Sequence, residues 1–259
     1  GDLGVSLRTG QPVSVEIQRR FAATLELTTV AMLLSFMLGV PVGVLAARYP
    51  RHWLARLEKW LSLFGIAIPI FWLGMLLQMV LAGSLNILPL QGRSVLPPPT
   101  HSISGLLLID TLFNGEWRKF HDALQHIVMP SLTLAMASFG IITRNVRVSM
   151  AEVLRRPFIQ NARAVGIPEN RIFFRYALKN ALIPVITVAG LVYGYLLGGT
   201  FLVEQVFDWP GVGQLAVYSI LTNDMPVVTG VALLYAVIYT GINFILDIGY
   251  RIIDPRLRG

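Results

Sequence analysis

The sequence contains no cysteine among its 259 residues. Disulfide bonds, thiolate chemistry and cysteine-based metal sites are therefore excluded. Charged residues are also scarce, at 14% of the chain, where soluble domains approach about a quarter. Hydrophobic residues instead make up 54%, and the mean hydropathy is +0.64. This composition predicts an all-α integral membrane protein and excludes an ordinary soluble domain.

Motifs for nucleotide hydrolysis and metal binding are missing as well. None of Lys59, Lys119 and Lys179 follows a glycine, so the chain has no Gly-Lys-Ser/Thr phosphate-binding loop. No His-Glu-x-x-His motif is present, and no two of the four histidines have the i, i+4 spacing of a helical zinc site. We therefore predict no catalytic residue, no metal site and no cofactor in this chain, which is not expected to be an enzyme by itself.

The basic residues are unevenly distributed between the loops. Of the 21 Lys and Arg residues, 15 lie in residues 48–59, 144–179 and 251–258, and six lie elsewhere. A net charge of +7 would suggest nucleic acid in a soluble protein, but loop-sorted charge is typical of orientation in a bilayer. We predict no nucleic-acid partner, an external N-terminal end and a cytoplasmic C-terminus.

Five apolar stretches meet or approach the roughly 20 residues that a bilayer crossing requires. These predicted membrane helices are residues 27–47, 60–85, 127–142, 181–203 and 227–248 of a single transmembrane domain, 1–259. Between them we predict an external N-terminal segment (1–26), external loops (86–126 and 204–226), a cytoplasmic region (144–180) and a cytoplasmic tail (249–259). Gly190, Gly194 and Gly198 recur at every fourth residue, which predicts close helix packing.

The cytoplasmic region is basic, amphipathic and broken in its middle. Leu154, Phe158, Ala162 and Val165 have the spacing of one helix face. Gly166-Ile167-Pro168 then predicts the end of one helix and the start of another. The pattern favours a docking element, although any cytoplasmic loop of a membrane protein collects basic residues.

The second external loop has a different character, because Glu204–Pro226 contains no basic residue. Its Trp209-Pro210-Gly211 sequence suits a tight turn that folds back at the membrane surface, whereas the sequence alone favours an interfacial aromatic belt. Glu26, Glu204 and Asp247 lie near the ends of predicted crossings. We expect these carboxylates to be solvated or to support helix packing rather than to contact a substrate.

Five segments, in this order, resemble one family of membrane proteins. They are Ala162-Arg-Ala-Val-Gly166, Ala177-Leu-Lys-Asn-Ala-Leu-Ile-Pro184, Gly198-Gly-Thr-Phe-Leu-Val-Glu204, Phe207-Asp-Trp-Pro-Gly-Val-Gly213 and Asp254-Pro-Arg-Leu-Arg258. The family is the dipeptide, oligopeptide and nickel permeases of ABC importers. Gly1–Ser6 and Ala23–Leu27 also resemble sequence that follows the first membrane helix of this family. Gly1–Arg20 is polar and lacks the apolar core of a signal peptide, so we expect the sequence to begin within a longer parent protein.

The resemblance implies a six-helix permease core, of which this sequence holds five crossings, in the cytoplasmic (inner) membrane of a bacterium or archaeon. It implies peptide import by alternating access. The implied partners are a second homologous permease, two ATPase subunits that bind ATP and Mg, an extracytoplasmic substrate-binding protein and membrane lipid. The implied coupling residues are Phe158, Ala162, Arg163, Ala164, Gly166, Ala177, Asn180 and Pro184. The implied external gate residues are Glu204, Phe207, Trp209, Pro210, Gly211 and Gly213.

Alternatives remain at the level of the sequence. The cargo could be nickel or another small solute. An ion-driven secondary transporter or channel would also be polytopic, but it should keep ionisable groups at mid-membrane depth, and the predicted crossings show none there. A non-transporting membrane scaffold is a further alternative. The match to the family's coupling motif is also incomplete, because Gln160 and Asn161 stand where the wider importer motif has Glu and Ala.

Overall fold

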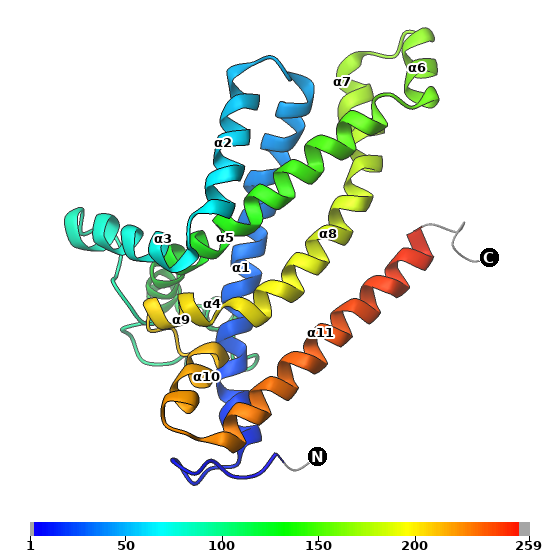
Figure 1. Cartoon of the computed structure of the whole chain (residues 1–259). Coiled ribbons are helices and arrows are strands. Elements are labelled where there is room, and N and C mark those ends of the chain that lie inside the picture. Colours follow the sequence, from blue (N-terminus) through cyan, green and yellow to red (C-terminus); the bar gives the residue numbers. More distant parts are fainter. Residues whose placement is uncertain (1–2, 254–259) are drawn as a thin grey trace. The chain divides into compact units, whose positions relative to one another are not determined.

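The computed structural model describes residues 3–253, apart from the side chains of residues 54, 66, 247 and 249–253 (Figure 1). The secondary structure of this part is helical, with one isolated antiparallel bridge between Val5 and Pro12. The predicted all-α class is confirmed. The predicted motif Asp254–Arg258 and most of the predicted tail lie outside the described residues.

The helices follow each other in one order along the chain. They are α1 (Val13–Arg48), α2 (Trp53–Ala67), α3 (Ile70–Leu77), the π-helix η1 (Gln78–Ser84), α4 (Leu107–Phe113), α5 (Trp117–Val153), α6 (Pro157–Ala164), α7 (Glu169–Arg171), the π-helix η2 (Ile172–Ala177), α8 (Leu178–Gly199), α9 (Phe201–Val206), α10 (Val212–Leu221) and α11 (Met225–Ile253). They form two compact units, and α1, α5, α8 and α11 contribute residues to both. Unit 1 comprises residues 1–31, 69–134 and 193–241, and unit 2 the remainder.

Four helical segments in the described part of the chain are long and apolar enough to cross a membrane. They are Val13–Arg48, Trp117–Val153, Glu169–Gly199 and Met225–Leu246. A fifth crossing results if Ala55–Gly65 and Ile70–Ser84 together form one span. The predicted stretch 60–85 is therefore not one continuous helix. Pro69 explains the break, because proline lacks an N–H donor and disfavours helical geometry in the residue before it.

The predicted third crossing, 127–142, is much shorter than the helix that contains it. Helix α5 has 37 residues and includes both Pro130 and Arg144. Hydropathy marks only the apolar middle of such a helix, whereas the hydrogen-bonded backbone continues into polar sequence at both ends. Arg144 therefore does not mark the end of the helix, and basic residues further along α5 lie on a rigid element.

Unit 1 has an apolar core between the start of α1, helix α10 and the start of α11. Its buried members are Val13, Ile17, Val212, Leu215, Val227 and Val231. A Cβ atom on Gly230 would lie 2.5 Å from Cγ1 of Val13, so α11 approaches α1 closely at this glycine. This core positions α10 and the loop that precedes it.

Unit 2 is held by close contacts between small residues of α1, α2 and α5. A Cβ atom on Gly43 would lie 2.7 Å from Cβ of Val146, and one on Gly140 would lie 3.0 Å from Cα of Ser62. The Ser35 and Ser138 hydroxyls are 2.6 Å apart. Small side chains let membrane helices approach until backbones and hydroxyls make contact.

The three glycines at four-residue spacing in α8 differ in their surroundings. A Cβ atom on Gly190 would lie 2.4 Å from Cδ2 of Leu246, in α11, so this glycine permits close packing within unit 2. Gly194 is buried. A Cβ atom on Gly198 would meet no heavy atom within 4 Å in the described part of the chain. The close approach to Leu246 therefore explains the glycine at position 190.

Candidate functional site

The basic region predicted to dock a partner, residues 144–180, contains a separate short helix, α6, in unit 2. Helix α5 ends at Val153, and Arg156 is extended, with φ −69° and ψ 148°, before Pro157 opens α6. Proline disfavours helical geometry in the residue before it and fits the first helical turn. The local sequence therefore separates α6 from α5.

Helix α6 ends in a glycine turn. Gly166 has φ +77°, its N–H donates to the Arg163 carbonyl at 3.0 Å, and the Ile167 N–H donates to the Ala162 carbonyl at 3.1 Å. These two hydrogen bonds and the left-handed glycine form a Schellman motif, which caps the carbonyl end of a helix. Pro168 then caps α7. The predicted helix, bend and second helix are present.

The apolar face predicted across this segment is partly wrong. Leu154 precedes α6, and Val165 is its C-terminal cap, because Pro157 and Gly166 set the ends of the helix. The buried side chains of α6 are Ile159 and Ala162, at 0% and 8% exposure. Ile159 was not among the predicted coupling residues, although its three-residue spacing from Ala162 is a helix-face signal.

The outward side of the segment combines apolar and charged groups. Phe158 is 40% exposed and Val165 76% exposed. Arg163 Nε lies 2.7 Å from Glu169 Oε1 across the glycine turn, and both side chains are about half exposed. A surface ion pair of this kind adds little stability, but it links the two helices that flank the turn.

Other contacts attach the turn to α1 within unit 2. Arg48 Nη2 donates to Asn170 Oδ1 at 2.6 Å, and its guanidinium lies 5.4 Å from the centre of the Phe173 ring. The remaining predicted coupling residues lie nearby in sequence. Ala164 is exposed at the end of α6, Ala177 is fully buried, and Asn180 and Pro184 are exposed on α8. Contacts with Arg48 therefore attach the turn to α1, while Phe158 and Val165 remain exposed.

The second predicted site, in unit 1, is built around the carboxyl group of Glu204. Glu204 is 0% exposed. Its Oε1 accepts hydrogen bonds from the Thr24 and Thr200 hydroxyls at 2.7 and 2.8 Å. Its Oε2 accepts one from the Gln214 N–H at 2.9 Å. The carboxyl group thus joins α1, α9 and α10, and it is not solvated.

Two predicted gate glycines leave room for this carboxyl group. A Cβ atom on Gly211 would lie 2.3 Å from Glu204 Oε2. A Cβ atom on Gly213 would lie 2.7 Å from Cα of Phe201 and 2.9 Å from Glu204 Oε2. The Thr24 hydroxyl also accepts a hydrogen bond from the Val212 N–H at 2.9 Å, between the two glycines. Glycine is therefore required at positions 211 and 213 because the loop backbone passes too close to Glu204 for a Cβ atom.

The aromatic residues of this loop are buried in protein. Trp209 is 1% exposed, and its indole N–H donates to the Ala23 carbonyl at 2.9 Å. Phe207 is 2% exposed and lies against Gly74 of α3. The favoured interpretation of Trp209 as part of an interfacial belt is therefore wrong, whereas the tight turn is present, with Pro210 exposed at its tip. We call Glu204, Thr24, Trp209, Gly211 and Gly213 the carboxyl knot.

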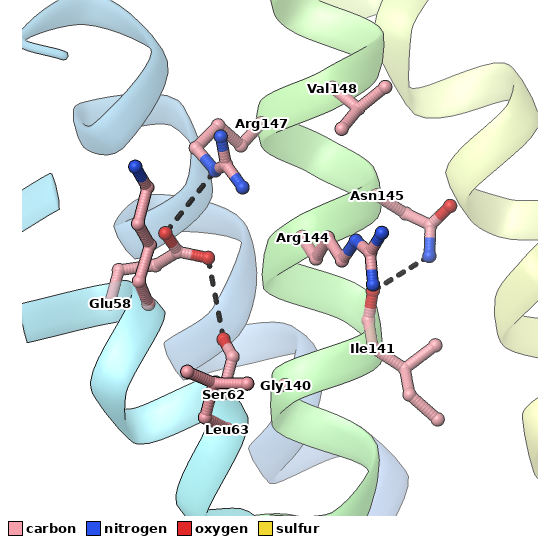
Figure 2. Close-up of a pocket in the computed structure, with 10 residues that line it drawn as sticks. Glu58, Ser62, Leu63, Gly140, Ile141, Arg144, Asn145, Arg147 and Val148 are labelled. Atoms are coloured by element: carbon pink, nitrogen blue, oxygen red, sulfur yellow. Dashed lines mark hydrogen bonds and ion pairs between the residues drawn. The ribbon is translucent and has the colours of Figure 1, made fainter. Parts of the chain in front are cut away.

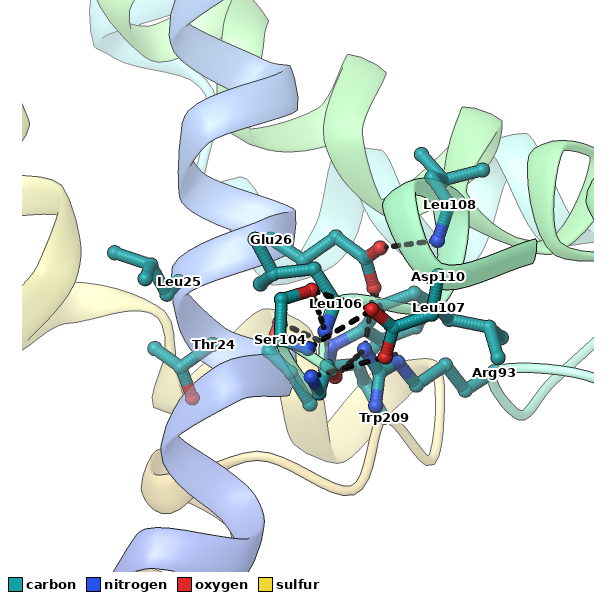
Figure 3. Close-up of polar contacts among 12 residues, drawn as sticks. Thr24, Leu25, Glu26, Arg93, Ser104, Leu106, Leu107, Leu108, Asp110 and Trp209 are labelled. Carbon is teal, nitrogen blue, oxygen red and sulfur yellow. Dashed lines mark hydrogen bonds and ion pairs between the residues drawn. The ribbon is translucent and has the colours of Figure 1, made fainter. Parts of the chain in front are cut away.

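A second buried carboxylate attaches the long loop of residues 86–126, which is predicted to be external, to α1 (Figure 3). Glu26 Oε2 lies 2.6 Å from Nη2 and 3.1 Å from Nε of Arg93, and its Oε1 accepts a hydrogen bond from the Leu108 N–H at 2.7 Å. Arg93 Nη2 also donates to the Gly105 carbonyl at 2.9 Å, and its guanidinium lies 5.9 Å from the centre of the Trp209 indole. Glu26 is therefore not solvated, and Arg93, which the sequence did not single out, is its counter-ion.

Replacing Arg93 with glutamine is expected to destabilise the protein by about 3–5 kcal/mol. The substitution would leave Glu26, whose side chain is 4% exposed, as a buried charge without its counter-ion. Thermal unfolding of the purified protein measures the effect. The matched control is Arg118→Gln, since Arg118 is exposed and has no ion pair among the described side chains. Equal stability of the two variants would contradict the assigned role of Arg93.

Burial raises the pKa of Glu204 above its ordinary value of 4.5, against opposing hydrogen bonds from Thr24, Gln214, Thr200 and Gly213. The folded state then binds the proton more tightly than the unfolded state. The stabilisation that results is complete below pH 4.5 and is lost as pH rises through the raised pKa.

We expect the unfolding temperature of the native protein to fall over this range, and to fall less in Glu204→Gln, which cannot ionise. Thermal unfolding between about pH 4 and about pH 8 measures the difference. The control variant is Glu152→Gln, because the Glu152 side chain is 68% exposed. The same pH dependence in Glu204→Gln and the native protein would show that Glu204 does not titrate in this way.

Comparison with known proteins identifies the family. Residues 39–259 match the model of the binding-protein-dependent transport system inner membrane component. The probable D,D-dipeptide transport system permease protein DdpB of Escherichia coli K12 is 45% identical, over 99% of this chain and 76% of its own length. The dipeptide transport system permease protein DppB of the same strain is 40% identical, over 100% and 77%. The oligopeptide transport system permease protein AppB of Bacillus subtilis 168 is 39% identical, over 99% and 76%.

A solved structure shares the fold. A chain of the MetNI methionine ABC transporter, in inward-facing conformations, superposes with a TM-score of 0.67 at 19% identity, over 93% of this chain and 97% of that one. The resemblance stated from the sequence motifs is confirmed. The chain is a multi-pass membrane protein that belongs to the family of binding-protein-dependent transport system inner membrane components, the permease subunits of ABC importers.

Proposed function

We propose that this chain is one of two permease subunits that carry di- or oligopeptides across the cytoplasmic membrane. Two ATPase subunits drive the transport, and an extracytoplasmic substrate-binding protein delivers the peptide. Support for the cargo comes from the relatives, whose names specify D,D-dipeptide, dipeptide and oligopeptide transport. Support for the partners comes from the family, whose members belong to binding-protein-dependent systems.

The observation that carries the proposal is that α6 and its glycine turn have one buried side and one exposed side. The helix is anchored by Ile159 and Ala162, while Phe158 and the C-terminal cap Val165 are 40% and 76% exposed. Anchored on one side and exposed on the other, α6 is suited to dock in a groove of an ATPase subunit. Closure of the ATPases would then displace α6 together with α7, η2 and α8, which follow it in the chain.

ATP binding can drive transport only if the ATPase subunits contact the two conformations of the permease differently. ATP-bound ATPases must favour one conformation of the permease over the other, because a partner shifts an equilibrium only by its difference in affinity for the two states. In the orientation that the basic loops predict, α6 and the C-terminus are cytoplasmic, and the carboxyl knot is external. The knot would hold the external gate loop as one rigid piece that moves with α1, α9 and α10.

The test is transport by the purified assembly in proteoliposomes. We expect ATP-dependent accumulation of a labelled dipeptide in the presence of the cognate binding protein, and none with a non-hydrolysable ATP analogue. Labelled nickel, offered under the same conditions, tests the alternative cargo. Accumulation of nickel without peptide would overturn the peptide assignment, and ion-driven uptake without ATP would overturn the importer mechanism.

A further inference from the structure

An open cavity of about 600 Å³ lies within unit 2, between α2 and α5 (Figure 2). Its lining combines basic, polar and apolar side chains. The residues are Glu58, Lys59, Ser62, Leu63, Gly140, Ile141, Arg144, Asn145, Arg147 and Val148. The volume falls within the range of about 300–1,000 Å³ that ligand sites occupy. The proposed coupling segment and the carboxyl knot contribute no residue to it.

The acidic group in the cavity is neutralised by one of the basic groups. Glu58 is 1% exposed, its Oε2 lies 3.2 Å from Arg147 Nε, and its Oε1 accepts a hydrogen bond from the Ser62 hydroxyl at 3.4 Å (Figure 2). Because a buried carboxylate needs a counter-ion, Arg147 is committed to Glu58. The ion pair forms a fixed polar part of the cavity wall.

The two other basic groups have no such partner. Lys59 and Arg144 are exposed, and no ion pair or hydrogen bond joins either side chain to another described residue. With Glu58 and Arg147 neutral as a pair, Lys59 and Arg144 give the cavity two uncompensated positive charges. An anion with two or more acceptor oxygens would satisfy both donors.

The apolar part of the cavity indicates an anion attached to a lipid. Leu63 and Val148, both in the lining, are 60% and 52% exposed, and the neighbouring Trp60 and Phe64 are 61% and 53% exposed. Exposed apolar and aromatic residues on a helix proposed to cross the membrane face acyl chains and the headgroup region. Basic pockets between membrane helices bind phosphate headgroups of anionic lipids.

We propose that this cavity binds the headgroup of an anionic phospholipid, with Lys59 and Arg144 at the phosphate and Leu63 and Val148 against the glycerol and first acyl carbons. The cavity then lies in the cytoplasmic leaflet if the proposed orientation holds. Binding itself depends on neither the cargo nor the coupling role of α6.

The test is lipid binding by the intact, delipidated transport assembly, measured by native mass spectrometry. Phosphatidylglycerol and phosphatidylcholine are titrated against the native assembly, against Lys59→Gln/Arg144→Gln, and against the control Arg51→Gln/Arg56→Gln. The control removes two exposed basic residues that do not line the cavity. Thermal unfolding of both double variants checks that the fold is retained.

We expect the native assembly and the control to retain phosphatidylglycerol in preference to phosphatidylcholine. The Lys59→Gln/Arg144→Gln variant should bind phosphatidylglycerol roughly 25-fold more weakly, since each basic residue near the phosphate contributes about fivefold. An equal loss in the control, or no loss in the cavity variant, would overturn the proposal. Displacement of phosphatidylglycerol by millimolar inorganic phosphate would also overturn it, because the site would then bind the free anion.

Discussion

Replacing Gly166 with valine is expected to lower ATP-driven uptake about tenfold or more, while the amount of assembled protein in the membrane stays unchanged. Gly166 has φ +77°, and a Cβ atom there would meet no heavy atom within 4 Å among the described residues. The expected effect is therefore backbone strain without a steric clash. The left-handed conformation costs a residue with a Cβ atom about 1–2 kcal/mol, and 1.4 kcal/mol is about a tenfold shift in an equilibrium.

The matched control at this position is Gly166→Asn. Asparagine adopts the left-handed conformation more readily than other residues with a Cβ atom, and it also ends helices. Uptake should follow the order glycine, asparagine, alanine, valine. Full uptake by Gly166→Val in proteoliposomes would reject the role of the glycine turn in coupling, since it would show that transport tolerates the strained or rearranged turn.

Replacing Gly211 with alanine is expected to destabilise the protein by about 3 kcal/mol or more and to abolish uptake. The new Cβ atom would lie 2.3 Å from Glu204 Oε2 and 2.4 Å from its Cδ. Glu204 cannot move aside freely, because Thr24, Thr200 and the Gln214 N–H hold its carboxyl group in a fully buried position. Either the loop moves or these hydrogen bonds break, and overpacking and lost buried hydrogen bonds each cost about 1–3 kcal/mol.

A double-mutant cycle separates the clash from a general effect on the loop. Glu204→Ala removes the carboxyl group, so Gly211→Ala should cost clearly less in that background than in the native protein. Gly198→Ala is the control glycine, because its Cβ atom would meet no heavy atom within 4 Å in the described part of the chain. Additive unfolding free energies for Glu204→Ala and Gly211→Ala would contradict the carboxyl knot.

The parts of the coupling segment that the sequence predicted are those with local causes. Gly166 and Pro168 determine helix ends through their own backbone preferences, so the break between α6 and α7 can be read from neighbouring residues. The ends of α6 matter for the prediction of its apolar face. If residues 154–165 are taken as one helix, Leu154, Phe158, Ala162 and Val165 share a face. Helix α6 contains two of these four, Phe158 and Ala162.

The buried carboxylates could not be predicted because their partners lie far away in the sequence. Thr24 and Glu204 are separated by 180 residues, and Glu26 and Arg93 by 67. Near the end of an apolar stretch, a carboxylate has the same local pattern whether it is solvated or buried against a counter-ion. The motif around Gly211 and Gly213 predicted a tight turn, but its physical cause, the Glu204 carboxyl group, appears only when α1, α9 and α10 are assembled.

Site-directed cross-linking tests the assignment of α6 most directly. Because the chain contains no cysteine, Phe158→Cys places a single thiol on the exposed side of α6, and Ile103→Cys, at a side chain that is 78% exposed, places one in the predicted external loop. The thiols are cross-linked to lysines of the intact assembly with a short heterobifunctional reagent, and uptake by each variant is measured beforehand. We predict a cross-link to an ATPase subunit from Phe158→Cys and none from Ile103→Cys. A cross-link from Ile103→Cys, or none from a reactive Phe158→Cys thiol, would contradict the docking of α6 on the ATPase.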